Sequence, residues 1–390
     1  MTPRISFLVP DINSPVIGPV TVLARSLESA YDVEIVGPDF GHGVCPMYRD
    51  SYPYRAVSMP RLYRLPEYWQ ESRRLGQALT GDVLIAVKAY ADTVPVVLRE
   101  KKRRGVKALA YLDEWDGALQ AMRPWPSRIA ATLKHLHHPL EDWAYPWVER
   151  MIPKLDGVWS TTTWLQKRFG GEVVHMGVDT EFFRPLPVEA TQSLKRDYGL
   201  GEMKLIVFGG VVRPHKGIEL ILEALARIGR TDYRLVIIGP KNQHVEALEG
   251  NPRFSPYLVA LGSRAKEDMP AHLAMADVMV LPLSDNLLAR SQMPCKVFEA
   301  MAMAKPVIGS AISDLPLILE GCGWIVPPGD SESLAQSIAY AFDRPEEAAA
   351  KGAAARAKCE TEFSAEGCGA RLRGMVEELI PRLADSAGSE

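Results

Sequence analysis

A lysine and a glutamate three residues apart, Lys296 and Glu299, are the side chains whose spacing points most directly to ligand binding. They lie in the stretch 294–308, where alanine, methionine, phenylalanine and glutamate favour a helix of about three turns. A Lys-Pro pair at 305–306 ends this helix, and Val-Ile at 307–308 begins a predicted strand. Side chains at this spacing project from the same edge of a helix, so both groups can reach one ligand.

The beginning of this predicted helix suits a phosphate group. First-turn N–H groups have no partner within the helix, the helix dipole is positive there, and a proline such as Pro294 is tolerated. A carboxylate one turn further in repels an anion, but it accepts hydrogen bonds from hydroxyl groups such as a ribose diol. Phosphate and ribose together predict a nucleotide. The alternative is an ordinary amphipathic helix on which Lys296 and Glu299 form a solvated pair.

A second candidate loop, residues 209–217, lies between a predicted strand and a predicted helix. The adjacent glycines Gly209 and Gly210 let the backbone approach a ligand, and Arg213 and Lys216 add two cations that could hold a pyrophosphate. The loop matches neither the Walker pattern nor G-x-G-x-x-G, so the alternative is a turn with two solvated cations. Both candidate loops follow strands, and parallel strands would open them onto the same sheet edge.

Short apolar runs alternate with helical patterns in two successive series, which predicts an α/β fold with parallel sheets covered on both faces. At 390 residues the chain has room for two such domains. The predicted strands are 5–9, 33–36, 83–87, 108–112 and 158–160, then 204–208, 234–238, 257–261, 278–281, 307–308 and 323–326. A proline-containing polar joint near 178–203 separates the series. We therefore expect domains at 1–180 and 181–365, with ligands bound in a cleft between them.

The composition is that of an ordinary globular protein. A net charge of −3 gives no reason to expect nucleic acid as a partner. The five cysteines are scattered and lack metal-site spacing, which favours a reducing cytosol. We expect no signal peptide, because a strand begins at once, and no membrane span, because no apolar run is long enough. The expected location is cytoplasmic.

Four motifs together resemble those of a known family. In chain order they are residues 177–185, 210–217, 294–308 and 326–330, the last followed by a helical pattern. The set looks like that of retaining GT-B glycosyltransferases of the GT4 type (glycosyltransferase group 1). The likeness covers most of residues 150–380, and over 1–150 it is one of topology alone. It implies a GT-B fold of two Rossmann-like doubly wound domains facing a cleft, with a last helix, within 366–390, that packs back toward the N-terminal domain.

By this resemblance, Lys216 neutralises the diphosphate of the donor and Glu299 holds the ribose hydroxyls. The N–H groups around the start of the 294–308 helix meet the phosphates, residues 261–263 face the base, and a loop at Gly18 closes over the phosphates. The donor-binding positions implied are Gly18, Gly210, Arg213, Lys216, Gly262, Ser263, Ser291, Cys295, Lys296 and Glu299. The catalytic positions implied are Asp113, Arg213, Lys216 and Glu299.

The chain departs from the family pattern at two positions. The first glutamate of the usual E-x7-E pair falls on Ser291, and the sequence instead follows the P-x-K-x-x-E form found in many relatives. The arginine that usually stands five residues before the lysine falls on Val211. Either Arg213 replaces the usual arginine from a different position in the loop, or one cation fewer neutralises the diphosphate.

The first half of the chain offers acidic candidates directly after the predicted strand 108–112. Asp113, Glu114 and Asp116 follow that strand, and relatives often place a His or Asp there against the transferred sugar. We expect Asp113 in this role, with a helix N-cap as the alternative. Lys88 follows another predicted strand, where it either contacts an acceptor or, as we expect, is exposed.

A basic and aromatic region suggests contact with a membrane surface. Residues 49–134 contain 16 lysines and arginines, among them the basic run 101–104, and nine acidic residues. Trp125, Trp143 and Trp147 follow, together with three histidines that we assign to the surface. Basic residues beside amphipathic aromatics can hold a protein on an anionic membrane, here the inner membrane face. The alternative is a helix-end charge run with tryptophans in the core.

These features predict a retaining hexosyltransferase that moves a sugar from a UDP-, GDP- or ADP-sugar to an acceptor hydroxyl of a glycan, a lipid-linked glycan or a small molecule. The nucleotide-sugar is a substrate, and we expect no cofactor and no metal, because side chains and helix ends neutralise the diphosphate. Two alternatives remain. One is another nucleotide-sugar enzyme on this fold, such as a 2-epimerase. The other, suggested by Ser291 and Val211, is a catalytically weak nucleotide-sugar-binding or scaffold protein.

Overall fold

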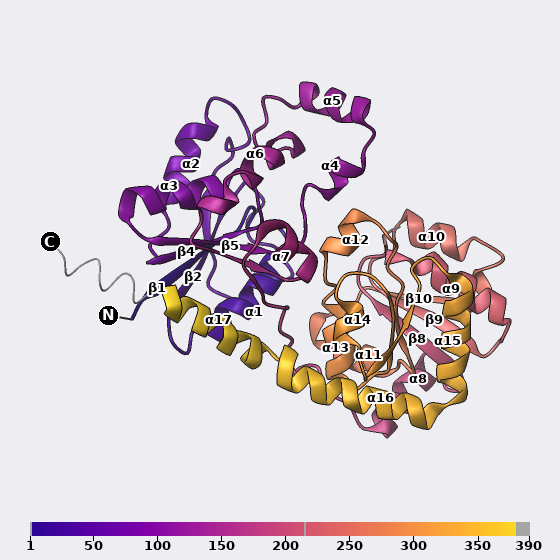
Figure 1. Cartoon of the computed structure of the whole chain (residues 1–390). Helices are drawn as coiled ribbons and strands as arrows, with labels where there is room; N and C mark the ends of the chain where they lie inside the picture. The colour runs from indigo at the N-terminus through magenta and orange to yellow at the C-terminus, as the bar shows by residue number, and fades with distance from the viewer. Residues whose placement is uncertain (1, 214–215, 380–390) are drawn as a thin grey trace. The chain divides into compact units, whose positions relative to one another are not determined.

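The computed structural model describes residues 2–213 and 216–379, which divide into two compact units (Figure 1). The N-terminal unit combines residues up to Gly177 with the helix that starts at Ala365, and the C-terminal unit runs from Val178 to Ser364. Pro214 and His215 of the glycine loop lie outside the described residues, as does the 380–390 part of the expected last helix.

The N-terminal unit is built on one sheet of seven parallel strands in the order β3-β2-β1-β4-β5-β6-β7. The strands are β1 Arg4–Leu8, β2 Asp32–Asp39, β3 Arg55–Ser58, β4 Val83–Val87, β5 Lys107–Leu112, β6 Gly157–Ser160 and β7 Glu172–Val173. The central strand β4 is buried along its whole length, as expected for an apolar run covered on both faces. The strand order reverses beside β1, which is where doubly wound sheets bind ligands.

Helices cover both faces of this sheet, with α2 and α3 on one face and α1 and α17 on the other (Figure 1). The helices of this unit before residue 177 are α1 Ile17–Leu27, α2 Tyr68–Gln77, α3 Val94–Arg104, α4 Ala118–Met122, α5 Trp125–Lys134, η1 Asp142–Ala144, α6 Tyr145–Glu149, η2 Ile152–Lys154 and α7 Thr163–Phe169. Helix α5 differs from the others along the sheet because it contributes no buried residue to the core.

The C-terminal unit has two three-stranded parallel ladders, β10-β9-β8 and β11-β12-β13. A parallel bridge between Ile206 and Val278 joins them, so β8 and β11 are neighbours and the order repeats that of the first unit. The strands are β8 Lys204–Gly209, β9 Tyr233–Ile238, β10 Leu258–Gly262, β11 Met279–Leu281, β12 Val307–Ser310 and β13 Gly323–Val326.

Short helices connect these strands and two longer ones follow them. They are α8 Val188–Asp197, α9 Ile218–Ile228, α10 Gln243–Glu249, η4 Ser255–Tyr257, η5 Lys266–Asp268, α11 Met269–Ala274, α12 Leu287–Ser291, α13 Lys296–Ala302, α14 Leu315–Ile318, α15 Ser331–Asp343, α16 Pro345–Lys358 and the π-helix η6 Cys359–Phe363. No described helix is long and apolar enough to cross a membrane.

Two expectations about helix ends are wrong. Helix α13 has seven residues, not about three turns, and begins after Cys295. Gly18 lies within α1 and not in a loop before it, because prolines at 15 and 19 fit the start of a helix as well as a turn. The ring of Tyr48 fills the space beside Gly18, since a Cβ there would lie 2.4 Å from its Cζ atom.

Helix α17, Ala365–Leu379, lies beside α1 and completes one face of the N-terminal sheet (Figure 1). Leu372 and Val376 are fully buried in that core. The guanidinium of Arg373 donates a hydrogen bond to the carbonyl oxygen of Ser26 at 2.6 Å. Gly369 permits the close approach, because a Cβ at this position would lie 2.5 Å from the Cβ atom of Ser26.

We predict that Gly369→Ala destabilises the protein by about 1–3 kcal/mol, because the added methyl group forces α17 away from α1. Gly374→Ala is the matched control on the same helix, since a Cβ there meets nothing within 4 Å. It should stabilise by up to about 1 kcal/mol through helix propensity. Urea unfolding of both variants tests this packing, and equal effects of the same sign would contradict it.

Candidate functional site

The carboxyl ends of β8, β9 and β10 come together through glycine backbone. The N–H of Gly210 donates to the carbonyl of Ile238 at 2.7 Å, and the N–H of Gly239 donates to that of Gly262 at 3.1 Å. A Cβ on Gly239 would lie 2.2 Å from the carbonyl oxygen of Gly210. Side chains are thus excluded from this edge, and the backbone is left open to a ligand.

Lys296 brings the 294–308 segment to this glycine edge. Gly210 has a φ of +122°, and a Cβ there would lie 3.1 Å from the Nζ atom of Lys296. The same ammonium lies 5.4 Å from the ring centroid of Phe208. It has no hydrogen-bond acceptor among the described residues, so its charge is available to an anion.

Lys216 makes a second link between the two loops. Its Nζ atom donates to the Oε1 atom of Gln292 at 3.1 Å, directly after the end of α12. The next residue, Gly217, has a φ of +69°, and a Cβ there would lie 2.0 Å from the carbonyl oxygen of Pro282. The loop after β8 is therefore held against the chain after β11. Gln292 was not identified from the sequence, where a lone glutamine gives no signal.

Glu299 supplies the negative group. Its side chain is half-buried, and burial raises the pKa of its carboxyl, while Lys296 opposes that shift. Within the described part of the chain, this carboxyl makes no hydrogen bond or ion pair. A carboxylate without a partner at a partly buried position can accept hydrogen bonds from ligand hydroxyls.

The other predicted donor residues differ in exposure. Arg213 and Ser263 are exposed, and Gly262 ends β10 with a φ of +75°. Cys295 is the N-cap residue of α13. Ser291 is fully buried, and its hydroxyl donates to the carbonyl oxygen of Leu288 at 3.0 Å. The serine at the position of the usual first glutamate is thus turned into its own helix, away from solvent.

In the N-terminal unit, Lys88 lies at the centre of a group of three carboxylates. Its Nζ atom is 2.5 Å from Glu114, 3.0 Å from Asp116 and 3.2 Å from Asp113. The expectation that Lys88 is exposed is wrong, because only 7% of its surface is accessible. Strands β4 and β5 are neighbours, so the lysine that ends one meets the acidic loop that follows the other.

The charges of this group depend on one another. Burial opposes the charge of Lys88, but Asp113, Asp116 and Glu114 raise its pKa well above the usual value. Burial also raises the pKa of Asp113, and it raises that of Asp116 to about 6, although Lys88 opposes both shifts. The ammonium of Lys88 therefore forms ion pairs with three carboxyl groups that are partly or fully buried.

This arrangement bears on the two interpretations of Asp113. The helix that follows, α4, has Gly117 as its N-cap residue, so the N-cap alternative for Asp113 is wrong. The described residues contain no group of three or more His, Cys, Asp or Glu side chains that could hold a metal ion. Contact between Asp113 and a sugar stays a prediction.

We predict that Asp116→Asn changes how stability depends on pH. A carboxyl whose pKa is raised on folding lowers the free energy of unfolding as pH rises from about 4 to 6. The variant lacks this carboxyl. Its free energy of unfolding, relative to that of the wild type, should therefore rise by about 2 kcal/mol between pH 4 and pH 7. Urea unfolding at both pH values measures the difference.

Lys88→Met is the opposing control for this measurement. It leaves three acids without their cation, so at pH 7 it should cost about 3–5 kcal/mol. At pH 4 the cost should shrink as the acids become protonated. A pH-independent effect of both variants would contradict this account of the group.

Comparison with known proteins relates this chain to glycosyltransferases. Residues 202–344 match the model of a family described as glycosyl transferases group 1. The GDP-mannose-dependent alpha-(1-6)-phosphatidylinositol monomannoside mannosyltransferase of Mycolicibacterium smegmatis is 29% identical over 188 residues, which are 46% of this chain and 49% of that protein. The putative colanic acid biosynthesis glycosyltransferase WcaL of Escherichia coli K12 is 27% identical over 216 residues, 53% and 51% of the two chains. This chain spans about half the length of these relatives.

Similarity to solved structures extends over nearly the whole chain. The HepE protein of Anabaena, solved in complex with UDP, has a TM-score of 0.74 at 16% identity and covers 96% of this chain and 100% of its own. Sucrose-phosphate synthase from Thermosynechococcus elongatus has a TM-score of 0.74 at 17% identity, with 97% and 100% covered. The GT-B fold predicted from the sequence is confirmed, and so is the resemblance to group 1 glycosyltransferases.

Proposed function

We propose that this chain, a GT-B fold with a glycosyl transferases group 1 match in its second half, is a retaining GT4-type glycosyltransferase. It moves a sugar from a nucleotide-diphosphate donor to an acceptor hydroxyl. The observation that supports this most is the meeting of two loops at one strand edge. Lys216 of the first loop bonds to Gln292, and Lys296 of the second segment lies beside Gly210, so each loop brings an ammonium group to the other.

In this proposal the diphosphate lies against Gly210 and is neutralised by Lys216 and Lys296, with Arg213 as a further exposed cation. Glu299 accepts hydrogen bonds from the ribose hydroxyls. The chain then acts by positioning the donor and stabilising the departing diphosphate. The leaving phosphate takes the proton of the acceptor hydroxyl, and the new bond forms on the face that the leaving group vacates. Side-chain cations take the place of a metal ion.

The relatives narrow the class of substrates to be tried. The HepE structures hold UDP and UDP-glucose, and the mycobacterial relative is named for GDP-mannose and a phosphatidylinositol mannoside. We accordingly propose a UDP- or GDP-sugar as donor, with an ADP-sugar as the remaining candidate. The proposed acceptor is a glycan, a glycolipid or a small metabolite.

A second candidate is a nucleotide-sugar-binding protein with weak transfer activity. Its support is the side chain of Ser291, which is buried and hydrogen-bonded to backbone where the family usually has a glutamate. Val211, at the position of the usual arginine, supplies no charge. Donor binding without hydrolysis or transfer, across a panel of donors and acceptors, would favour this candidate.

We predict that Lys216→Ala and Glu299→Gln each weaken donor binding about 10- to 100-fold, because each removes a charged contact to the ligand. Lys204→Ala is the matched control, since it removes a lysine from the opposite end of β8. Calorimetric titration with UDP, GDP and ADP and their sugars measures the affinities. Unchanged affinity in both variants would contradict the site.

The reaction itself is tested by the product. We expect the transferred sugar to keep the anomeric configuration that it has in the donor, with full activity in the presence of EDTA. Proton NMR of the new anomeric centre reports the configuration directly. An inverted product would contradict the retaining mechanism, and loss of activity that magnesium restores would contradict metal independence.

A further inference from the structure

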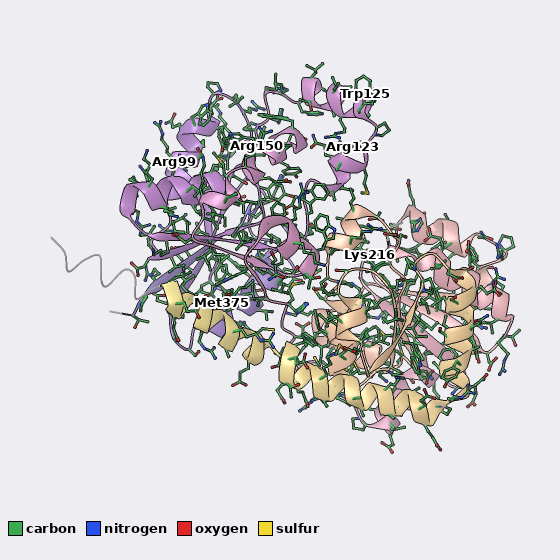
Figure 2. All side chains as sticks on the ribbon, in the orientation of Figure 1. Arg99, Arg123, Trp125, Arg150, Lys216 and Met375 are labelled. Atoms are coloured by element: carbon green, nitrogen blue, oxygen red, sulfur yellow. The ribbon has the colours of Figure 1, made fainter. Side chains whose placement is uncertain are left out.

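The connection from β5 to β6 carries an apolar face that the core does not use. Helix α5 has no buried residue, and Trp125, Ile129 and Leu133 are 71%, 50% and 70% exposed. They stand four residues apart, so they share one face of the helix. In Figure 2, Trp125 lies at the outer margin of the N-terminal unit. Large apolar side chains exposed together on one helix mark an interaction surface.

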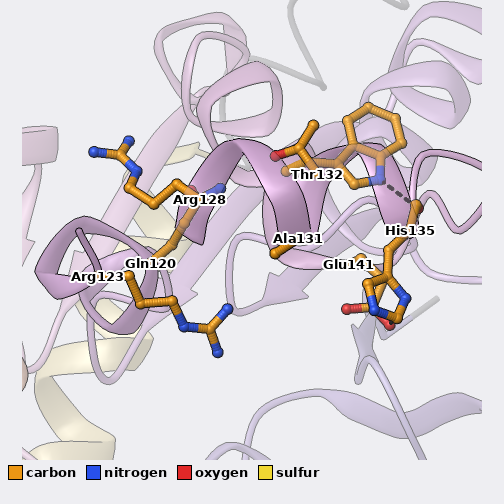
Figure 3. A pocket seen from close by; sticks show the side chains of 8 residues that line it. Gln120, Arg123, Arg128, Ala131, Thr132, His135 and Glu141 are labelled. Carbon is orange, nitrogen blue, oxygen red and sulfur yellow. Dashed lines mark hydrogen bonds and ion pairs between the residues drawn. The ribbon is translucent and has the colours of Figure 1, made fainter. Parts of the chain in front are cut away.

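The charged residues on or directly beside α5 are basic, and the nearest acidic residue along the chain after it is Glu141, which also lines the cavity below and lies 3.6 Å from His135. No acidic residue occurs between 117 and 140, while Arg123, Arg128 and Lys134 lie on or beside α5. Figure 3 shows Arg123 and Arg128 at the wall of a cavity of about 240 Å³ between α4 and α5. A neighbouring hollow of about 290 Å³ is lined by Trp125, Ile129 and Leu133 together with Arg128. Apolar and cationic groups thus alternate on the same surface.

Several of the other basic and aromatic residues of this region have partners in the protein, although Lys102 and Trp147 are exposed. In the run 101–104, Lys101 pairs with Asp156 at 3.0 Å, Arg103 pairs with Glu100, and Arg104 donates to carbonyl oxygens at 79–81. These residues lie in the last turn of α3, where cations stabilise the helix end. The helix-end alternative for this run is therefore supported.

Trp143 is engaged in the same way. Its indole N–H donates to the carbonyl oxygens of His135 and His138 at 3.0 and 2.9 Å, and its ring packs against the core. Trp143 is thus bonded and packed within the protein, and three large apolar side chains on one helix face are exposed on α5.

We propose that α5 docks on the surface of an anionic lipid bilayer. Trp125, Ile129 and Leu133 enter the interface between headgroups and acyl chains, and Arg123, Arg128 and Lys134 meet the lipid phosphates. Amphipathic helices with this division of residues bind membranes through apolar burial and attraction to anionic lipids. A second copy of the chain fits less well, because it would bring two faces of the same positive charge together.

This surface is independent of glycosyl transfer, but it lies close to the acidic group in the chain. Helix α4 begins five residues after Asp113, in the same connection between β5 and β6.

Vesicle flotation of the full chain tests the proposal. The protein should float with vesicles of phosphatidylcholine mixed with phosphatidylglycerol. About tenfold less protein should float with vesicles of phosphatidylcholine alone. Added salt should reduce the bound amount. Ile129→Ser/Leu133→Ser and Arg128→Glu should each reduce binding by about tenfold or more. Ile129 and Leu133 are exposed and Arg128 is partly exposed, so the variants should unfold at the same urea concentration as the wild type.

Lys102→Glu is the control for a general effect of charge, because it reverses an exposed lysine on α3. It should leave vesicle binding within about twofold of the wild type. Loss of binding in this variant, with α5 variants unaffected, would overturn the proposal. A second result would also overturn it. If the wild type is a dimer in sedimentation velocity and does not bind vesicles, and Ile129→Ser/Leu133→Ser is a monomer, then α5 binds a second copy of the chain.

Discussion

The close approach of backbone at the carboxyl ends of β8, β9 and β10 is the constraint on which the candidate site depends. A side chain on Gly239 would collide with the carbonyl oxygen of Gly210, and one on Gly210 would crowd the ammonium of Lys296. Because no side chain occupies this edge, the loop after β8 can contact the 292–299 segment. Two loops far apart in sequence thereby present cations and a carboxylate to one region.

Lys88 and Lys296 differ in their surroundings. In the N-terminal unit Lys88 is surrounded by its own carboxylates, so the protein satisfies the charge itself. In the C-terminal unit Lys296 and Glu299 have no hydrogen-bond partner among the described residues. Groups left unsatisfied at a partly buried position cost stability, and they persist where a ligand completes them. The lack of described partners for Lys296 and Glu299 supports the proposal that the donor binds in the C-terminal unit.

The sequence predicted the fold well where one local pattern was enough. Strands buried on both faces, such as β4, read as continuous apolar runs. The edge strand β3 was not predicted because most of its residues face solvent, and β7 because it has two residues. Gly18 was placed in a loop because proline and glycine signal a turn as readily as the first turn of a helix. Lys88 was misjudged because its partners follow another strand, and only the pairing of β4 with β5 brings them together.

We propose above all that the 209–217 loop and the 292–299 segment hold one nucleotide diphosphate between them. A crystal structure of the protein with UDP or GDP, whichever binds more tightly in titration, tests it most directly. We predict density for the diphosphate against the backbone of Gly210, within reach of Lys216 and Lys296, with the ribose hydroxyls on Glu299. A nucleotide bound elsewhere, with these four residues free of contact, would contradict it.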